Sequence, residues 1–276
     1  MNQSEDNSTF YMDYSYYFNG LRGLFSCNFF FSLPANIYVV RQIAGGGDGA
    51  VASEFFALNL STAQLLFCIL SVVYMLLNGL LRMDLNVGNI LLMVIFELML
   101  LSPAVFQGWI SLERYMAVVH PTIFLRFRPL SYRLACCIVT WLLIILDCSI
   151  TVTALSPLET TYLFIFKAAF FLVIMLYFGV HALCVLKQPG PGDGGRERES
   201  QNSMKRKAFK VIMITQGFSI LTLSLQVFVL APTLMHASAH VFIKVLLASL
   251  LISIISGFIP PLLYLHRAGK LPCIKF

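Results

Sequence analysis

The chain has 276 residues, of which 58% are hydrophobic and only 12% are charged, and its mean hydropathy is +0.81. Ordinary soluble domains carry about a quarter charged residues, so this composition excludes a protein whose main solvent is water. The formal net charge is +6. Most of the basic residues lie in short segments next to or between the apolar stretches, which argues against a nucleic-acid-binding surface and for a single membrane domain.

The chain begins with a polar, acidic and tyrosine-rich segment, residues 1–21, which we expect to be an extracellular tail. It lacks the basic stretch and following apolar stretch of a cleavable signal peptide, so the first span should serve as the anchor. Sequons begin at Asn2 and Asn7. They predict a glycoprotein with its N-linked glycans on this tail.

Seven apolar stretches follow, each close to or above the roughly 20 residues that a bilayer core requires of a helix. They cover residues 24–40, 55–81, 87–112, 134–154, 162–186, 211–232 and 241–265. Backbone groups in hydrocarbon must form their hydrogen bonds internally, and no alternating pattern suggests a barrel. We therefore predict an all-α membrane protein, a seven-transmembrane helix bundle over residues 22–266.

The distribution of charge predicts the orientation of this bundle. Most of the 19 Lys and Arg residues lie between stretches three and four, between five and six, or after seven, while the remaining segments are richer in acids. Basic loops are retained in the cytoplasm. The N-terminus should therefore be outside and the C-terminus inside, at the plasma membrane.

Two cytoplasmic segments are expected to lack a fold. Residues 187–207 contain the run PGPGDGGRERES, whose glycines, prolines and charges predict a disordered loop. Residues 267–276 form a short tail in which Cys273 follows basic residues. That thiol is either a site of palmitoylation at the membrane surface or a free cytosolic thiol.

A motif stands at the cytoplasmic end of the third stretch, where residues 111–121 read SLERYMAVVHP. An arginine there, Arg114, can be held by the adjacent carboxylate of Glu113 and can extend toward a partner when the helices part. The alternative is that both charges only mark the membrane boundary, with the arginine reaching to the interface.

This motif and four further landmarks occur in the order and spans typical of rhodopsin-like G-protein-coupled receptors. The other landmarks are Asn36, the NLSTA run at 59–63, Trp141 and the PLLY run at 261–264. The chain therefore resembles a divergent member of that family. The resemblance implies that Glu113, Arg114, Tyr115, Pro261 and Tyr264 serve activation, and that the partner is a heterotrimeric G protein.

Several positions depart from the family pattern. No cysteine is placed for the usual outer disulfide, Gln64 replaces an Asp that helps to bind sodium, and the sixth stretch lacks the family's F-x-x-C-W-x-P motif. We therefore expect the disulfide and the sodium site to be lost. Signalling should accordingly be weak or atypical, or absent as in a decoy receptor.

Four ionisable residues lie inside the apolar stretches, where each costs at least about 2.5 kcal/mol unless it is paired or hydrated. They are Glu97, Asp147, Lys167 and Lys244. Helix rise places Glu97 roughly 25 Å above Arg114, and the others lie in the same outer half. They predict a ligand pocket, with Glu97 and Lys167 foremost and Gln226 behind, or structural ion pairs, or lipid-facing side chains.

The leading function is thus a receptor and signal transducer that couples an extracellular ligand to cytoplasmic G proteins by helix rearrangement. The alternative is a small channel or transporter, whose path the buried charges would line. An enzyme is not expected, because neither a G-x-S-x-G elbow nor an H-E-x-x-H zinc motif is present. No metal or cofactor is predicted, and membrane lipids are the remaining partners.

Overall fold

The computed structural model describes residues 17–46, 54–80, 85–127, 129–154, 157–187, 214, 216–231 and 239–267. The regular elements within them are all helical: η1 (Asn28–Ser32), α2 (Leu33–Ala44), α4 (Phe55–Leu80), α5 (Leu85–Val119), α6 (Pro121–Phe127), α7 (Leu130–Ala154), α8 (Pro157–Lys187) and α10 (Ala239–Arg267). An all-helical fold is the predicted class, and it is confirmed. Several predictions fall outside the described residues: the predicted glycosylation sites Asn2 and Asn7, the lipidation candidate Cys273, and residues 188–207 of the predicted loop.

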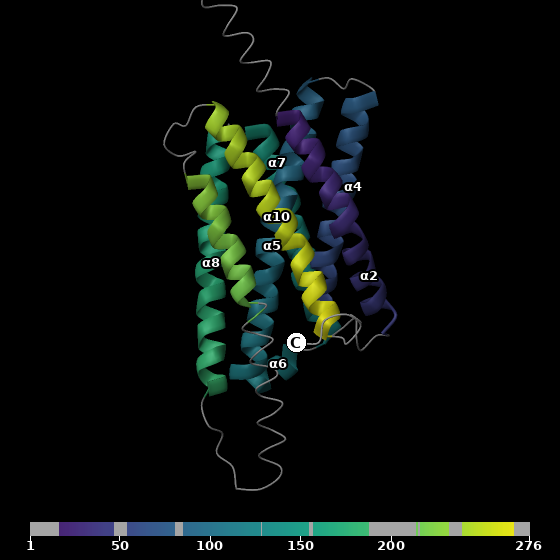
Figure 1. Cartoon of the computed structure of the whole chain (residues 1–276). Coiled ribbons are helices and arrows are strands. Elements are labelled where there is room, and N and C mark those ends of the chain that lie inside the picture. The colour runs from purple at the N-terminus through teal and green to yellow at the C-terminus, as the bar shows by residue number, and fades with distance from the viewer. Residues whose placement is uncertain are drawn as a thin grey trace, which may run out of the picture.

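Six of the helices are long and apolar enough to cross a membrane. The first runs continuously over Tyr17–Ala44 and so includes residues that the sequence assigns to the outer tail. A shorter apolar helix, Gln216–Leu230, lies in the sixth predicted span, but residues 188–213, 215 and 232–238 around it are outside the described residues. The seventh crossing and the orientation in the membrane therefore remain predictions. The start of the first helix and the end of α10 lie at opposite ends of the bundle (Figure 1).

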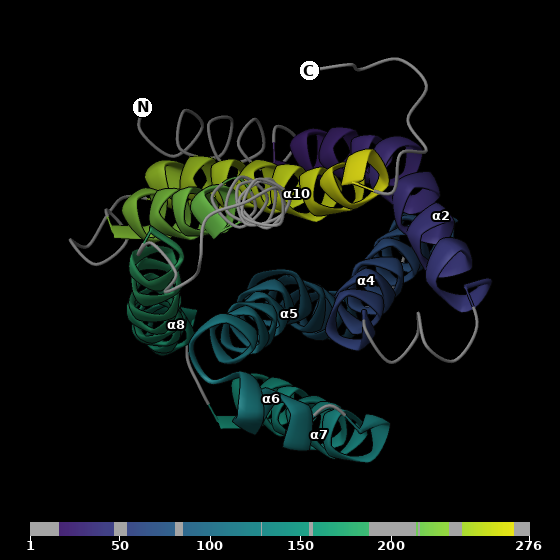
Figure 2. The same cartoon turned by 90° about the horizontal axis from the view of Figure 1, so that it is seen from below.

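Helix α5 is the central helix of the bundle. It contacts α4, α7, α8 and α10, and Figure 2 shows it between α10 on one side and α6 with α7 on the other. Its inward-facing residues include Ile95, Met99 and Phe106, each no more than 1% exposed. Polar side chains on a helix surrounded in this way must find their hydrogen-bond or ion-pair partners on the neighbouring helices.

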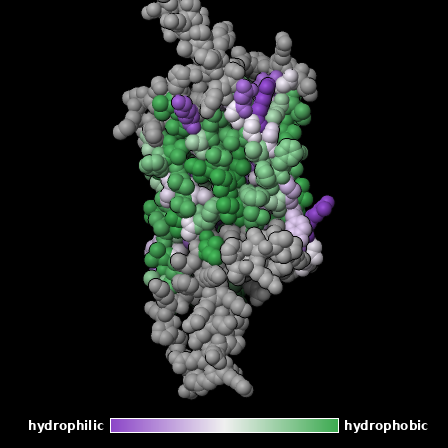
Figure 3. Space-filling view, in the orientation of Figure 1, coloured by the Kyte–Doolittle hydropathy of each residue, from purple (hydrophilic) through white to green (hydrophobic). Residues whose placement is uncertain are grey.

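The outer surface of the bundle is apolar. Large side chains on α7 and α8 point away from the core, and Phe166 is 70% and Val173 65% exposed. The space-filling view shows hydrophobic side chains over the middle of one face, with strongly hydrophilic ones near its ends (Figure 3). Such a surface is stable only in contact with lipid.

The first helix is interrupted by the single π-helical stretch η1, Asn28–Ser32, which reads NFFFS. Asn28 and Ser32 are fully buried, while the three phenylalanines between them face outward. A π turn inserts an extra residue into the helix and changes which side chains share a face. Here both polar side chains lie inside the bundle, and Asn28 Nδ2 donates to Cys68 Sγ of α4 at 3.1 Å.

Helices α2, α4 and α10 meet closely at Gly257. Asn36 Nδ2 donates to the Gly257 carbonyl at 3.3 Å, and the buried Gln64 side chain packs against the same residue. A Cβ atom on Gly257 would lie 2.6 Å from Gln64 Oε1 and 2.8 Å from its Cδ. Glycine is therefore required here for close helix packing, which is the usual use of small residues between membrane helices.

Replacing Gly257 by alanine should lower the thermal stability of the detergent-solubilised protein by about 1 to 3 kcal/mol, as other overpacked cores do. Gly23→Ala is the matched control, because nothing lies within 4 Å of its added Cβ. That control should be neutral or slightly stabilising. Adding Gln64→Ala should relieve part of the Gly257→Ala defect, and equal melting temperatures for the two glycine variants would contradict this packing account.

Candidate functional site

Three of the four predicted intramembrane charges meet between α5, α7 and α8. Lys167 Nζ of α8 lies 3.2 Å from Glu97 Oε1 of α5 and 2.6 Å from Asp147 Oδ2 of α7. Thr151 Oγ1, one turn beyond Asp147 on α7, donates to the same Glu97 oxygen at 2.9 Å. We call these four residues the outer charge cluster.

Burial differs among the members of this cluster. The Glu97 side chain is 4% exposed, whereas those of Lys167 and Asp147 are 20% and 25% exposed. Glu97 is thus enclosed by the bundle and has hydrogen bonds from two neighbouring helices. The Lys167 ammonium contacts carboxylates on α5 and α7, so it joins α7 and α8 to the central helix. Removing one partner of such a buried pair would leave a buried charge without a counter-ion.

The other two ligand candidates lie elsewhere. Lys244 is exposed on the surface of α10, and the structure does not bring it into the outer charge cluster. Gln226 is buried on the helix Gln216–Leu230, where its Nε2 donates to Ser253 Oγ of α10. Gln226 therefore ties two helices together, and its polar group already has a partner.

A second buried charge pair lies at the other end of α5. Glu113 accepts from Arg133 Nη2 of α7, and the two side chains are 18% and 6% exposed. We call this contact the inner ion pair. The sequence suggested Arg114 as the partner of Glu113 and treated Arg133 only as a loop residue. The sequence contained one indication of this pair. Arg133 stands where the fourth apolar stretch begins, at about the same predicted depth in the membrane as Glu113.

The remaining activation candidates lie on α5 and α10. Arg114 is half-buried, and its charge acts on the Glu113 carboxylate while it makes further interactions. The Tyr115 ring points toward α8, with centroids 5.0 Å from Phe178 and 5.5 Å from His181. Pro261 is buried within α10; the side chain of Tyr264, on the same helix, lies outside the described residues.

A polar contact also crosses the bundle one turn above Arg114. Ser111 Oγ of α5 donates to Gln216 Oε1 at 2.7 Å, and Gln216 Nε2 donates to the Met175 carbonyl of α8 at 3.0 Å. Gln216 opens the helix Gln216–Leu230. This glutamine therefore links three helices in the half of the bundle that contains the inner ion pair, a contact that the sequence pattern did not predict.

The outer charge cluster predicts how the stability of the fold changes when its cation is removed. Lys167→Met leaves two carboxylates without their cation and should destabilise the fold by about 3 to 5 kcal/mol, the usual result of stranding a buried charge. Detergent melting and surface expression would both report the loss. Adding Glu97→Gln and Asp147→Asn should restore much of the stability, while the control Lys244→Met on the exposed α10 site should be neutral. Wild-type stability in Lys167→Met would refute the structural role.

Comparison with known proteins places these features in a family. A family model for the 7 transmembrane receptor (rhodopsin family) matches residues 35–264, which covers the helices that carry both charge sites. No curated protein is similar enough to be matched to the chain. The match extends over most of the sequence and confirms the resemblance seen at residues 111–121. The chain belongs to the rhodopsin family of seven-transmembrane receptors and is a multi-pass membrane protein of the signalling-receptor type.

Proposed function

We propose that the protein is a plasma-membrane receptor that couples an extracellular ligand to a heterotrimeric G protein by separating its helices at the cytoplasmic end. The observation that carries this proposal is the inner ion pair. It joins α5 to α7 beside Arg114 through one carboxylate and one guanidinium, a contact that can break without moving the rest of the bundle.

The arrangement supplies a two-state element of the kind a receptor needs. With the pair closed, Glu113 is held toward α7 and Arg114 lies half-buried beside it. With the pair open, the cytoplasmic end of α5 is released and Arg114 becomes available to a partner. A ligand shifts such an equilibrium only by binding the open state more tightly than the closed state.

Gln216 contributes a second restraint on this opening. Its hydrogen bonds to Ser111 and to the Met175 carbonyl hold the helix Gln216–Leu230 against α5 and α8. The sixth stretch lacks the family's usual tryptophan and proline motif. We infer that the Gln216 amide restrains the sixth helix in the closed state. Opening then requires two hydrogen bonds to break and does not depend on a proline kink.

The outer charge cluster indicates the ligand chemistry that this receptor would accept. It contains two carboxylates and one ammonium, and Asp147 and Lys167 retain partial exposure. The cluster therefore has an excess of negative charge, for which a cationic ligand group is the complement. Both carboxylates already contact Lys167, so the first role of the outer charge cluster is to hold the helices together.

The proposal is tested by Arg114→Ala in purified receptor incubated with a panel of G proteins. Nucleotide exchange should fall by about tenfold or more, the size of a coupling free energy of roughly 1 to 3 kcal/mol. Melting temperature should change little, since the substitution leaves the inner ion pair intact. Arg126→Ala, at an exposed site on α6, is the matched control and should retain exchange.

Full exchange activity in a well-folded Arg114→Ala protein would contradict the proposed coupling mechanism. Absence of exchange in the wild type with every G protein of the panel would instead favour a decoy receptor. Glu113→Gln is the converse variant, because it weakens the contact to Arg133. It should raise basal exchange by favouring the open state.

A further inference from the structure

The outer charge cluster reaches the surface of the bundle between α7 and α8. Both helices pack against α5, but in the described part of the chain they make little close backbone contact with each other, and Figure 2 shows them as separate neighbours of α5. The side chains of Asp147 and Lys167 meet across this separation and are 25% and 20% exposed. Part of each charged side chain is therefore accessible.

The surface around this charged pair is apolar. The residues one turn before and one turn after the pair on each helix have large hydrophobic side chains that are 40% to 59% exposed. They are Leu143 and Ile150 of α7 and Leu163 and Phe170 of α8. Side chains three or four residues apart share a helix face. The charged pair therefore lies on a face of the bundle that lipid covers.

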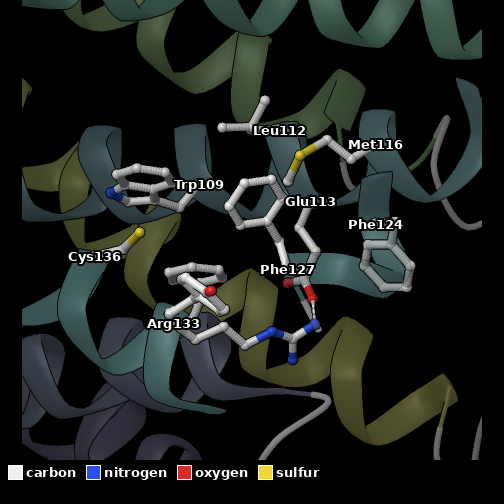
Figure 4. A pocket seen from close by; sticks show the side chains of 10 residues that line it. Trp109, Leu112, Glu113, Met116, Phe124, Phe127, Arg133 and Cys136 are labelled. Atoms are coloured by element: carbon white, nitrogen blue, oxygen red, sulfur yellow. Dashed lines mark hydrogen bonds and ion pairs between the residues drawn. The ribbon is translucent and has the colours of Figure 1, made fainter. Parts of the chain in front are cut away.

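The cluster and the inner ion pair face different leaflets of the bilayer. Figure 4 shows Arg133 directed at Glu113 in the inner ion pair. Helix rise places Asp147 roughly 21 Å from Arg133 along α7. A hydrocarbon core is about 30 Å thick, so two points this far apart within it cannot share a leaflet. A molecule that reaches the cluster from lipid must therefore come from one leaflet, which is the outer one in the predicted orientation.

The charges of the cluster determine which chemical group can bind there. Two carboxylates face one ammonium, so one negative charge is left over. Lys167 Nζ contacts Asp147 Oδ2, whereas Asp147 Oδ1 accepts no hydrogen bond from the residues that the structure describes. An anion would be repelled by this excess charge, and a neutral group would leave it uncompensated. A cation that donates an N–H meets both requirements.

We propose that the cluster binds the protonated amine of an amphiphile that enters from the bilayer between α7 and α8. An N–H of the amine donates to Asp147 Oδ1, and its charge offsets the excess negative charge. The apolar chain remains in the leaflet, against the exposed hydrophobic side chains of α7 and α8. This inference rests on the proposed receptor function, and it adds to it the class of the ligand and the route by which the ligand arrives.

Four radiolabelled probes test the proposal: dodecylamine, dodecanol, dodecylsulfonate and butylamine. Binding is measured on the purified full-length protein in phosphatidylcholine nanodiscs, and empty nanodiscs correct for partitioning into lipid. Dodecylamine should bind about tenfold or more tightly than dodecanol, because its hydrogen bond joins two charged groups. Butylamine lacks the chain that concentrates the probe in the leaflet and should bind far more weakly than dodecylamine.

The anionic probe separates local from overall electrostatics. The formal net charge of the protein is +6, which by itself would favour an anion. Dodecylsulfonate should nevertheless bind no better than dodecanol, because the charge at the cluster has the opposite sign. Tighter binding of dodecylsulfonate than of dodecylamine would overturn the proposal.

A variant assigns the amine preference to one carboxylate. Asp147→Asn keeps the size of the side chain but removes its charge, so dodecylamine should bind about as weakly as dodecanol, whose own affinity should not change. Glu159→Gln is the matched control, because it removes an acid at an exposed position in the first turn of α8, outside the cluster. That control should bind dodecylamine as the wild type does.

Equal binding of dodecylamine and dodecanol by the wild-type protein would overturn the proposal, and this comparison does not depend on how well any variant folds. An amine preference that survives Asp147→Asn would also overturn it. Butylamine that binds as tightly as dodecylamine would show a site reached from water and not from lipid. These measurements contain no G protein. Selective amine binding to a protein that never drives nucleotide exchange would therefore contradict the proposed function and leave the ligand site intact.

Discussion

The structure depends on the neutralisation of two carboxylates carried by one central helix in a medium that cannot solvate them. Glu97 and Glu113 lie in opposite halves of α5, roughly 24 Å apart by helix rise, and both are largely buried. Each receives a cation from another helix, Lys167 of α8 or Arg133 of α7. Because an unpaired charge costs several kcal/mol in this environment, these contacts fix which helices stand beside α5.

In a bilayer the lipid is as apolar as the side chains of the helices. Hydrophobic burial therefore gives little preference for helix–helix contact over helix–lipid contact. Specific contacts must therefore select the partners. Trp141 Nε1 donates to Asn59 Oδ1, which joins two family landmarks on α4 and α7, and Gln226 joins its helix to Ser253 of α10. The half of the bundle near Glu97 is joined by three charges, whereas the half near Glu113 is joined by the inner ion pair, the Gln216 amide and the Trp141–Asn59 hydrogen bond.

Much of the helical fold could be predicted, because the length of the apolar stretches is a direct consequence of the bilayer. Depth along the helices placed Glu97, Asp147, Lys167 and Lys244 at a similar level, but it could not separate the three that meet from Lys244, which is exposed on α10. The partner of Glu113 did not follow, because the choice between Arg114 and Arg133 depends on how α5 faces α7. The π turn at Asn28 and the position of Gln216 are likewise set by packing, for which the sequence pattern carries no signal.

In the proposed mechanism the inner ion pair holds the receptor in its closed state, and this role can be tested by exchanging the charges of its two members. Basal nucleotide exchange on purified G protein is measured for Glu113→Arg, for Arg133→Glu and for the two together. Each single reversal places like charges in contact and should raise basal exchange, whereas the double variant restores an attractive pair and should return it toward the wild-type value. Exchange that rises with the single variants and stays equally high in the double variant would contradict the account, because the pair would then not be the restraint.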